Sequence, residues 1–215
     1  MKVFLIGSNG QIGKHLVKLL QDSNQHTLKA MVRSGEQANA LKESGVDAIV
    51  ANLEGSVEEL AEAMQGSDAV IFSAGSGGKT GPDKTLLVDL DGAVKSMEAA
   101  EKVGANRYIM VSAFRAFDRE SWKDSPIKPY MVAKHYADRI LTESNLNYTI
   151  FGPGRLLNEP GTGKVQAGND IDKGSIPRED VARAVVQSLD EENTFKKTIG
   201  LMSGESTIEE AFKRL

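Results

Sequence analysis

Three residues of this sequence could together move a proton: Ser112, Tyr130 and Lys134. Tyr130 and Lys134 stand four positions apart, so a helix would place them on one face. A free phenol has a pKa near ~10, and because a neighbouring ammonium favours the phenolate, Lys134 is expected to lower the pKa of Tyr130. Tyr130 would then act as an acid or base while Ser112 holds a substrate hydroxyl or carbonyl oxygen. The alternative is an ordinary Tyr-Lys pair on the surface of an amphipathic helix.

A glycine-rich turn near the start of the sequence has the spacing of a phosphate-binding loop. The apolar run 2–6 leads into this turn, and a helix-forming segment follows it. Glycines at these positions permit a tight turn, a close approach of backbone N–H groups to phosphate, and close packing of helix on strand. The first-turn N–H groups and the helix dipole would then face the anion. The pattern predicts a dinucleotide pyrophosphate site formed by Gly7, Ser8, Asn9, Gly10, Gln11, Ile12 and Gly13.

The end of the second expected strand indicates the cofactor. NAD-selective folds carry an acid about 20 residues after the glycines, where it binds the adenosine ribose. This sequence has Arg33 and Ser34 there instead. A guanidinium and a hydroxyl suit a 2′-phosphate, so NADP is expected rather than NAD, unless Arg33 is simply a solvated residue at a strand end. The positions after the next two strands predict further cofactor contacts, from Asn52 and Leu53 beside the adenine and from Ser73, Ala74 and Gly75 at the switch point of the sheet.

Alternating strands and helices must position these residues. Apolar runs predict strands over 2–6, 27–33, 47–51, 69–74, 107–112 and 147–152. The intervening patterns predict helices near 11–22, 35–43, 56–64, 84–103 and 127–144, followed by helices over 177–189 and 207–213. We therefore expect an α/β fold with a doubly wound parallel sheet, the Rossmann fold. Residues 1–215 are expected to form a single domain, in which 153–215 contribute a small substrate-side lobe beginning with a Gly/Pro-rich surface loop that contains short strands, over 153–175.

Taken together, Gly7-x-x-Gly10-x-x-Gly13, Ser112 and Tyr130-x-x-x-Lys134 resemble the short-chain dehydrogenase/reductase superfamily, and most of all its atypical NAD(P)-binding epimerases and reductases. The resemblance covers nearly the whole chain. It implies that Tyr130 is the acid/base, that Ser112 orients the substrate oxygen, and that Lys134 also binds the nicotinamide ribose. It matches Asp89 to a family asparagine that supports a proton-relay water, although an ionised carboxylate cannot donate a hydrogen bond. Pro153 and Gly154 resemble the nicotinamide-side loop.

The substrate is expected to be small, because only 63 residues follow position 152. Aromatic residues between the serine strand and the tyrosine helix could line its pocket or could pack onto the domain instead: Phe114, Phe117 and Trp122, with Arg115 among them. Three functions fit these observations. The preferred one is an NADP-dependent oxidoreductase for a small carbonyl or alcohol. The others are an epimerase or dehydratase that retains its cofactor, and a non-catalytic NADP-binding sensor.

Composition narrows the classes of partner and site. The chain carries 26 basic and 30 acidic residues, a net charge of −4, which argues against nucleic-acid binding. The absence of cysteine excludes disulfides and thiolate metal sites, and the three scattered histidines predict no metal site. No apolar run approaches the ~20 residues of a membrane span, and the first residues do not resemble a secretion signal. We expect a cytoplasmic protein, a monomer or homodimer, that binds a small-molecule substrate.

Overall fold

The computed structural model describes residues 1–78 and 80–215. Its strands are β1 (Lys2–Ile6), β2 (Thr27–Val32), β3 (Asp47–Val50), β4 (Ala69–Phe72), β5 (Arg107–Val111), β6 (Asn147–Pro153), β7 (Arg155–Leu157), β8 (Lys164–Gly168), β9 (Ser175–Pro177), β10 (Lys197–Ser203) and β11 (Ser206–Thr207). Its helices are α1 (Gln11–Gln21), α2 (Gly35–Glu43), α3 (Val57–Met64), α4 (Pro82–Lys84), η1 (Thr85–Gly92), α5 (Ala93–Val103), η2 (Arg119–Trp122), α6 (Lys128–Glu143), α7 (Arg178–Gln187), η3 (Glu192–Thr194) and α8 (Ile208–Phe212).

Within the described residues, one nine-stranded sheet has the order β11-β8-β10-β6-β5-β4-β1-β2-β3, and β7 pairs with β9 in a separate two-stranded sheet. In this order, the seven neighbouring strands β10, β6, β5, β4, β1, β2 and β3 run parallel, whereas β8 is antiparallel to β10 and to β11. The chain passes from β1 to β2 on one side and later places β4 on the other side of β1. In such sheets ligands bind outside the carboxyl ends of the strands at this reversal.

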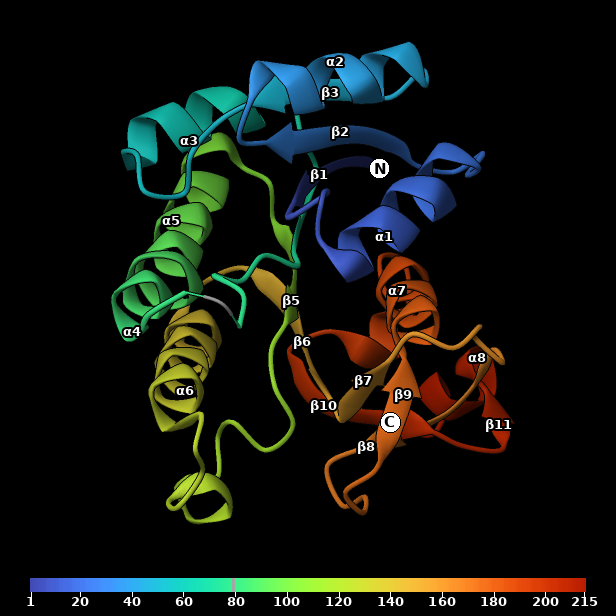
Figure 1. The fold of residues 1–215 in the computed structure, drawn as a ribbon. Helices are drawn as coiled ribbons and strands as arrows, with labels where there is room; N and C mark the ends of the chain where they lie inside the picture. The colour runs from blue at the N-terminus through green and yellow to red at the C-terminus, as the bar shows by residue number, and fades with distance from the viewer. Residues whose placement is uncertain (79) are drawn as a thin grey trace.

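Helices cover both faces of the sheet, as Figure 1 shows. One core lies under α1, α2, α7 and α8, and the other lies under α3, α5 and α6. Strands β4 and β5 are buried along their whole length, since their side chains meet helices on either face. The predicted α/β fold with a doubly wound sheet is therefore confirmed.

The expected strands and helices before residue 153 all form, with ends that shift by one or two residues, but the expected helix over 84–103 is composite. It consists of α4, the π-helix η1 and the α-helix α5 in direct succession. π-helical turns are rare and occur often at functional sites, because the wider turn changes where side chains point. Here η1 carries Asp89, which is buried.

Strand β10 is the main element that sequence reasoning missed. Its sequence, KTIGLMS, is interrupted by Gly200, and a glycine inside a strand weakens a pattern-based prediction. The structure explains this glycine, because a Cβ there would lie 2.7 Å from the carbonyl oxygen of Gly168 on the paired strand β8. The segment 153–175 contains β7 and β8 joined by irregular chain, as predicted.

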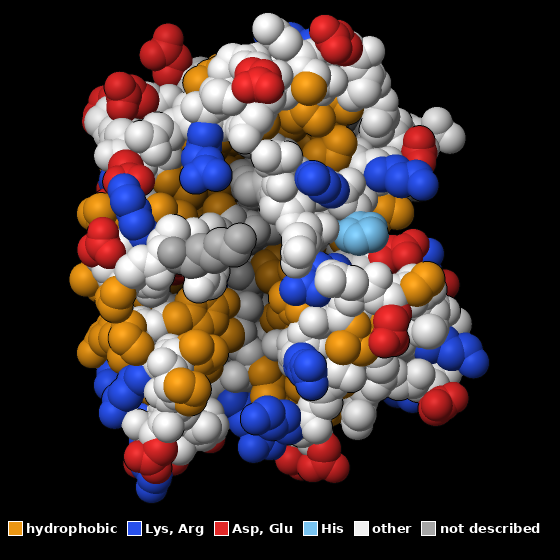
Figure 2. Space-filling view, in the orientation of Figure 1, with side chains coloured by type: hydrophobic (Ala, Val, Ile, Leu, Met, Phe, Trp, Pro, Cys, Tyr) orange, Lys and Arg blue, Asp and Glu red, His pale blue; other side chains and the backbone are white. Residues whose placement is uncertain are grey.

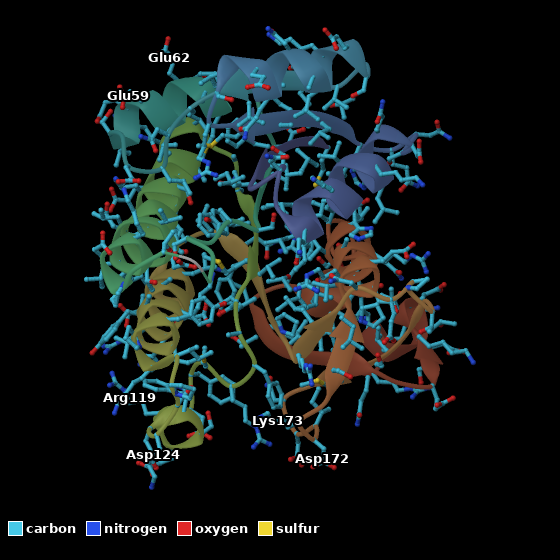
Figure 3. The ribbon with its side chains drawn as sticks, viewed as in Figure 1. Glu59, Glu62, Arg119, Asp124, Asp172 and Lys173 are labelled. Carbon is cyan, nitrogen blue, oxygen red and sulfur yellow. The ribbon has the colours of Figure 1, made fainter. Side chains whose placement is uncertain are left out.

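The periphery of the molecule is highly charged. In Figure 3, Glu59, Glu62, Arg119, Asp124, Asp172 and Lys173 extend outward, away from the sheet. Hydrophobic side chains on the visible surface gather around α4 and the start of α6 in Figure 2. Leu86 and Leu87, just after α4, and Ile127, just before α6, are exposed. Across the described ranges, no helix combines the length and the hydropathy that crossing a bilayer requires.

Candidate functional site: a cofactor groove that meets a Tyr-Lys cavity

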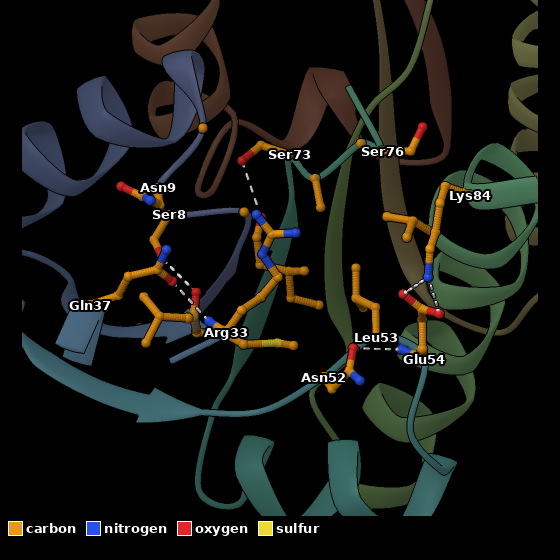
Figure 4. Close-up of a pocket in the computed structure, with 18 of the residues that line it drawn as sticks. Ser8, Asn9, Arg33, Gln37, Asn52, Leu53, Glu54, Ser73, Ser76 and Lys84 are labelled. Atoms are coloured by element: carbon orange, nitrogen blue, oxygen red, sulfur yellow. Dashed lines mark hydrogen bonds and ion pairs between the residues drawn. The ribbon is translucent and has the colours of Figure 1, made fainter. Parts of the chain in front are cut away.

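A cavity of about 360 Å³ lies at the carboxyl ends of β1 to β4, across the reversal of strand order. Most residues predicted to bind the cofactor line it, as Figure 4 shows: Gly7, Ser8, Asn9, Gly10, Arg33, Asn52, Leu53, Ser73, Ala74 and Gly75. The glycine turn, the end of β2 and the β3–α3 loop thus surround one space, as a dinucleotide site requires.

The glycine turn packs closely against neighbouring backbone, which leaves no room for a Cβ at Gly7 or Gly13. Gly7 has a φ of +92°, and a Cβ there would lie 2.6 Å from the backbone nitrogen of Ala74. A Cβ on Gly13 would lie 2.0 Å from the carbonyl oxygen of Gly7. Gly13 does not line the cavity and therefore acts through packing. Larger residues at either position would push the turn away from β4 or away from α1.

The amino terminus of α1 suits an anion. Gly10 is its N-cap and supplies no side-chain acceptor, and the first turn of α1 holds no acid. First-turn N–H groups without a cap are the usual ligands of a pyrophosphate. Ser8, by contrast, is buried and donates its hydroxyl hydrogen to the Met31 carbonyl oxygen at 2.5 Å, so its side chain ties the turn to β2.

Arg33 lies where the sequence predicts, at the carboxyl end of β2, and its side chain extends into the cavity in Figure 4. Its backbone N–H donates to Oε1 of Gln37 at 3.1 Å, which anchors the residue to α2. Among the described residues its guanidinium has no ion-pair partner. The hydroxyl oxygen of Ser34 accepts from the Gln37 N–H and caps α2, and Ser34 does not line this cavity.

The acid that lines this cavity is Glu54, which is already neutralised. Lys84 donates to both carboxylate oxygens of Glu54, at 2.8 and 2.7 Å. The ion pair connects the β3–α3 loop with α4, and Figure 4 shows it at one side of the cavity. Within the described lining, no unpaired carboxylate opposes a phosphate.

A second cavity of about 770 Å³ adjoins the first, and the two share Ser73 to Ser76 and Thr80. The predicted catalytic residues Ser112, Tyr130, Lys134 and Asp89 all line this second cavity, which we call the Tyr-Lys cavity. Gln11 and Ile12 line it as well, so the glycine turn lies between the two cavities. Pro153 and Gly154 line neither cavity, because Gly154 packs against Met202 and Gly174, whereas Leu156 does line the second one.

Lys134 and Asp89 form a buried pair at this second cavity. Lys134 Nζ lies 3.7 Å from Asp89 Oδ1, with the two side chains 2% and 1% exposed, and it donates to the Val111 carbonyl oxygen at 3.3 Å. Asp89 Oδ2 accepts from the Ser76 N–H at 2.9 Å. The π-helix therefore places a carboxylate between the lysine and the loop after β4. Gly75 must be small here, since a Cβ would lie 3.0 Å from Asp89 Oδ1.

Tyr130 stands beside this pair, with its ring 5.8 Å from Lys134 Nζ. Burial raises the pKa of Tyr130 more than the Lys134 charge lowers it, and the Asp89 and Asp138 carboxylates add to the rise. The predicted lowering by Lys134 is present, but the predicted net direction is wrong. A sequence pattern shows the neighbouring cation, whereas only the fold shows how much water is removed from the phenol.

Ser112, at the end of β5, has a partner that sequence reasoning missed. Its hydroxyl donates to Asp138 Oδ2 at 2.5 Å. Asp138 is 5% exposed, and burial raises its pKa to about 7. A spacing signal for this residue was available, because Tyr130, Lys134 and Asp138 recur every four positions along α6 and thus share one face.

Phe114, Arg115, Phe117 and Trp122, which lie between β5 and α6, do not line the substrate pocket as one alternative proposed. Trp122 is buried against Ala116 and Met131 and donates its indole N–H to the Ala116 carbonyl oxygen. Phe117 is exposed, and Phe114 and Arg115 line a small separate cavity next to Asp138. None of these four residues lines the Tyr-Lys cavity, whose apolar wall includes Ile12, Val111, Pro126, Ile127, Pro129 and Leu156. Arg178, at the start of α7, is a further lining residue that sequence reasoning missed.

Known proteins resemble this chain along its whole length. The uncharacterized sugar epimerase YhfK of Bacillus subtilis is 58% identical over 215 residues, which cover all of both chains. The solved structure of the "Putative NAD-dependent epimerase/dehydratase" of Bacillus halodurans is 40% identical, covers both chains fully and superposes with a TM-score of 0.92. The oxidoreductase ylbE of Lactococcus lactis is 35% identical with a TM-score of 0.89, and the match covers 100% of this chain and 96% of that one.

The profile of a family described as NAD(P)H-binding matches residues 7–192, which include the glycine turn, Arg33 and the Tyr-Lys helix. The chain therefore belongs to the NAD(P)H-binding family.

Proposed function

We propose that this protein is an NADP-dependent oxidoreductase acting on a small carbonyl or alcohol, with Tyr130 as the acid/base. The observation that carries the proposal is that the two cavities adjoin. The cavity beside Arg33 and the glycine turn shares Ser73 to Ser76 and Thr80 with the cavity lined by Tyr130, Lys134 and Ser112. A cofactor bound along this groove would bring its reactive end to these side chains.

The preference for NADP rests on charge. Arg33 offers a guanidinium without an ion-pair partner in the described chain, and the one acid in the described lining, Glu54, is engaged by Lys84. A 2′-phosphate would gain a charge-assisted hydrogen bond from Arg33 and would meet no free carboxylate. First-turn N–H groups of α1 would hold the pyrophosphate.

Bound nicotinamide supplies or accepts the hydride in this chemistry. Tyr130 would donate its phenolic proton to the carbonyl oxygen of the substrate. Its raised pKa keeps the phenol protonated at neutral pH, as an acid must be before it acts, although a phenol with a raised pKa gives up its proton less readily. Lys134 would stabilise the phenolate left behind, and Ser112 would hold the same substrate oxygen.

The test is a screen of NADPH oxidation against small aldehydes, ketones, quinones and flavins, repeated with Tyr130→Phe. Loss of a positioned acid is expected to lower kcat by about 10²–10⁴-fold, while NADPH affinity stays unchanged. Tyr136→Phe is the matched control, because Tyr136 lies on the same helix but is exposed and lines neither cavity. Undiminished turnover by Tyr130→Phe on a verified substrate would remove the acid role, and a flavin reductase that needs no tyrosine acid would give this result.

The similarity to the sugar epimerase of Bacillus subtilis and to the epimerase/dehydratase of Bacillus halodurans favours a second function, an NAD(P)-dependent epimerase. Such an enzyme returns hydride to the opposite face of its substrate, so it consumes no NADPH. Epimer interconversion of a sugar followed by NMR, at constant NADPH absorbance, would support this function. Net oxidation of NADPH with a carbonyl compound would favour the reductase.

A further inference from the structure

The hydrogen bond between Ser112 and Asp138 is buried, and its direction decides whether Ser112 can donate or accept a hydrogen bond toward the Tyr-Lys cavity. Ser112 is 4% exposed and Asp138 is 5% exposed, and the Ser112 hydroxyl donates to Asp138 Oδ2. A serine hydroxyl has one hydrogen. While that hydrogen points at Asp138, Ser112 can offer only oxygen lone pairs to the Tyr-Lys cavity that it also lines.

Among the described residues, no cationic side chain forms an ion pair with Asp138. Its second oxygen, Oδ1, has no hydrogen-bond partner within residues 1–78 and 80–215. Lys134, one turn earlier on α6, favours the ionised form of Asp138, but its ammonium lies beside Asp89 and the Val111 carbonyl oxygen. Burial dominates and raises the pKa of Asp138 to about 7, so both protonation states are accessible under physiological conditions.

Other groups around Asp138 add no charge that would fix its protonation state. Tyr130, two turns earlier on α6, is neutral because its own pKa is raised. Arg115, across the small cavity next to Asp138, directs its guanidinium to the Ile171 carbonyl oxygen and the Phe114 ring. The lining residues of that cavity from β6 and β10, namely Ile150, Gly152, Thr198 and Gly200, are uncharged.

Protonation of Asp138 would reverse the hydrogen bond. A proton on Oδ1 would find no acceptor, whereas a proton on Oδ2 faces the Ser112 oxygen at hydrogen-bond distance. The neutral carboxyl would therefore donate to Ser112 Oγ, and the Ser112 hydrogen would be free to turn into the Tyr-Lys cavity. Ionised Asp138 makes Ser112 an acceptor toward the cavity, and neutral Asp138 makes it a donor.

We propose that Asp138 is a positioning residue that sets the polarity of Ser112 and thereby selects the oxidation state of the substrate. With Asp138 protonated, Ser112 donates to a carbonyl oxygen. With Asp138 ionised, Ser112 accepts from an alcohol hydroxyl. The selection of substrate rests on the proposed oxidoreductase function, whereas the reversal of the Ser112–Asp138 hydrogen bond does not.

The reversal is tested without any substrate by ¹³C NMR of aspartate side-chain carboxyls, titrated from pH 5 to 9 with and without NADPH. One carboxyl is expected to titrate near neutral pH and to be missing from Asp138→Asn. In Ser112→Ala this titration is expected to move to higher pH, because the ionised carboxylate loses its donor. The proposal would be overturned if no carboxyl assigned to Asp138 titrated near neutral pH, or if the titration of Asp138 had the same midpoint in Ser112→Ala as in the wild type.

The selection is tested by the pH dependence of KM, using NADPH with the aldehyde or ketone found in the screen and NADP⁺ with the corresponding alcohol. As pH rises above the pKa of Asp138, the KM for the carbonyl compound is expected to rise by up to about tenfold per pH unit. As pH falls below that pKa, the KM for the alcohol is expected to rise. In Asp138→Asn the amide N–H would replace the carboxyl hydrogen, so the carbonyl KM should be low and independent of pH.

Asp22→Asn is the matched control, since Asp22 is exposed at the far end of α1, and it should keep the wild-type profile. A wild-type pH profile of the carbonyl KM in Asp138→Asn would refute the selection. If no carbonyl compound is reduced at all, the oxidoreductase function fails, and the NMR titration still decides whether the hydrogen bond reverses.

Discussion

Arg33 and Asp138 are the two residues whose charge bears most directly on this site. Arg33 reaches the cofactor groove without a counter-ion in the described chain, and Asp138 is buried with one unpartnered oxygen. The sequence predicts Arg33 because its position is counted from the glycine turn. It shows Asp138 only as one more helical residue, because the spacing does not show that a serine from β5 will meet it.

Arg33→Asp tests the choice of cofactor. Replacing a phosphate-facing guanidinium by a carboxylate is expected to weaken NADPH binding by about 10–100-fold, from the ~1.5–3 kcal/mol of a charged hydrogen bond, while NADH binding changes much less. Titration calorimetry with both cofactors measures the difference. Arg119→Asp, at the molecular periphery, should change neither affinity. Equal losses for both cofactors in Arg33→Asp would contradict a phosphate contact.

Asp138 is also expected to make stability depend on pH. Its pKa is about 7 in the folded protein and near ~3.9 in the unfolded chain, so between these values the folded state binds more protons. The contribution of Asp138 is therefore fully present below pH ~4 and is lost as pH rises toward and through about 7, by roughly 4 kcal/mol at most. Urea unfolding should show Asp138→Asn gaining stability relative to the wild type over this range. A constant difference from pH 4 to 8 would contradict the raised pKa.

At the scale of elements, the site depends on two tight junctions: the β1–α1 turn and the π-helix η1. The glycine turn is predictable because its three glycines are spaced as one phosphate-binding loop and lie between an apolar run and a helix. The π-helix is not predictable in this way. Its backbone hydrogen bonds join residues five apart instead of four, and its sequence has the pattern of an ordinary α-helix. Its consequence, the placement of Asp89 beside Lys134, is visible only in the structure.

Gly13→Ala tests the first junction. The new Cβ would lie 2.0 Å from the Gly7 carbonyl oxygen, a backbone atom that cannot rotate away. We expect a loss of about 1–3 kcal/mol in the free energy of unfolding and a weaker NADPH affinity, because the turn must shift. Gly35→Ala is the control, since no atom lies within 4 Å of its added Cβ and alanine favours helices. A stable Gly13→Ala variant with unchanged NADPH affinity would show that close packing of this turn is dispensable.

At the scale of the whole molecule, Arg107 joins the core sheet to the last third of the chain. It is 4% exposed on β5, and burial lowers its pKa to about 10. Its guanidinium donates to the carbonyl oxygens of Asn147, Ser188 and Leu189 and to the hydroxyls of Thr149 and Thr194. These partners lie 40 to 87 residues away in sequence, so one side chain connects β5 and β6 with the segment that leads into β10.

Arg107→Met is expected to lower the free energy of unfolding by about 2–4 kcal/mol, because at least two buried carbonyl groups lose their donors. Denaturant unfolding measures the loss. Arg139→Met is the control, since Arg139 is exposed on α6 and its ion pair with Glu143 should contribute less than ~1 kcal/mol. A loss of similar size in both variants would mean that burial of the Arg107 network is unimportant.

Four features could be predicted from the amino-acid sequence: the α/β class, the glycine turn, the position of Arg33 and the shared face of Tyr130 and Lys134. These features follow from local spacing, because turns, strand alternation and helical periodicity are set by neighbours along the chain. Four others become visible only in the folded molecule: the net direction of the Tyr130 pKa shift, the Lys134–Asp89 pair, the Ser112–Asp138 hydrogen bond and the strand β10. Burial and contacts between distant residues control these properties, and both exist only once the chain has folded.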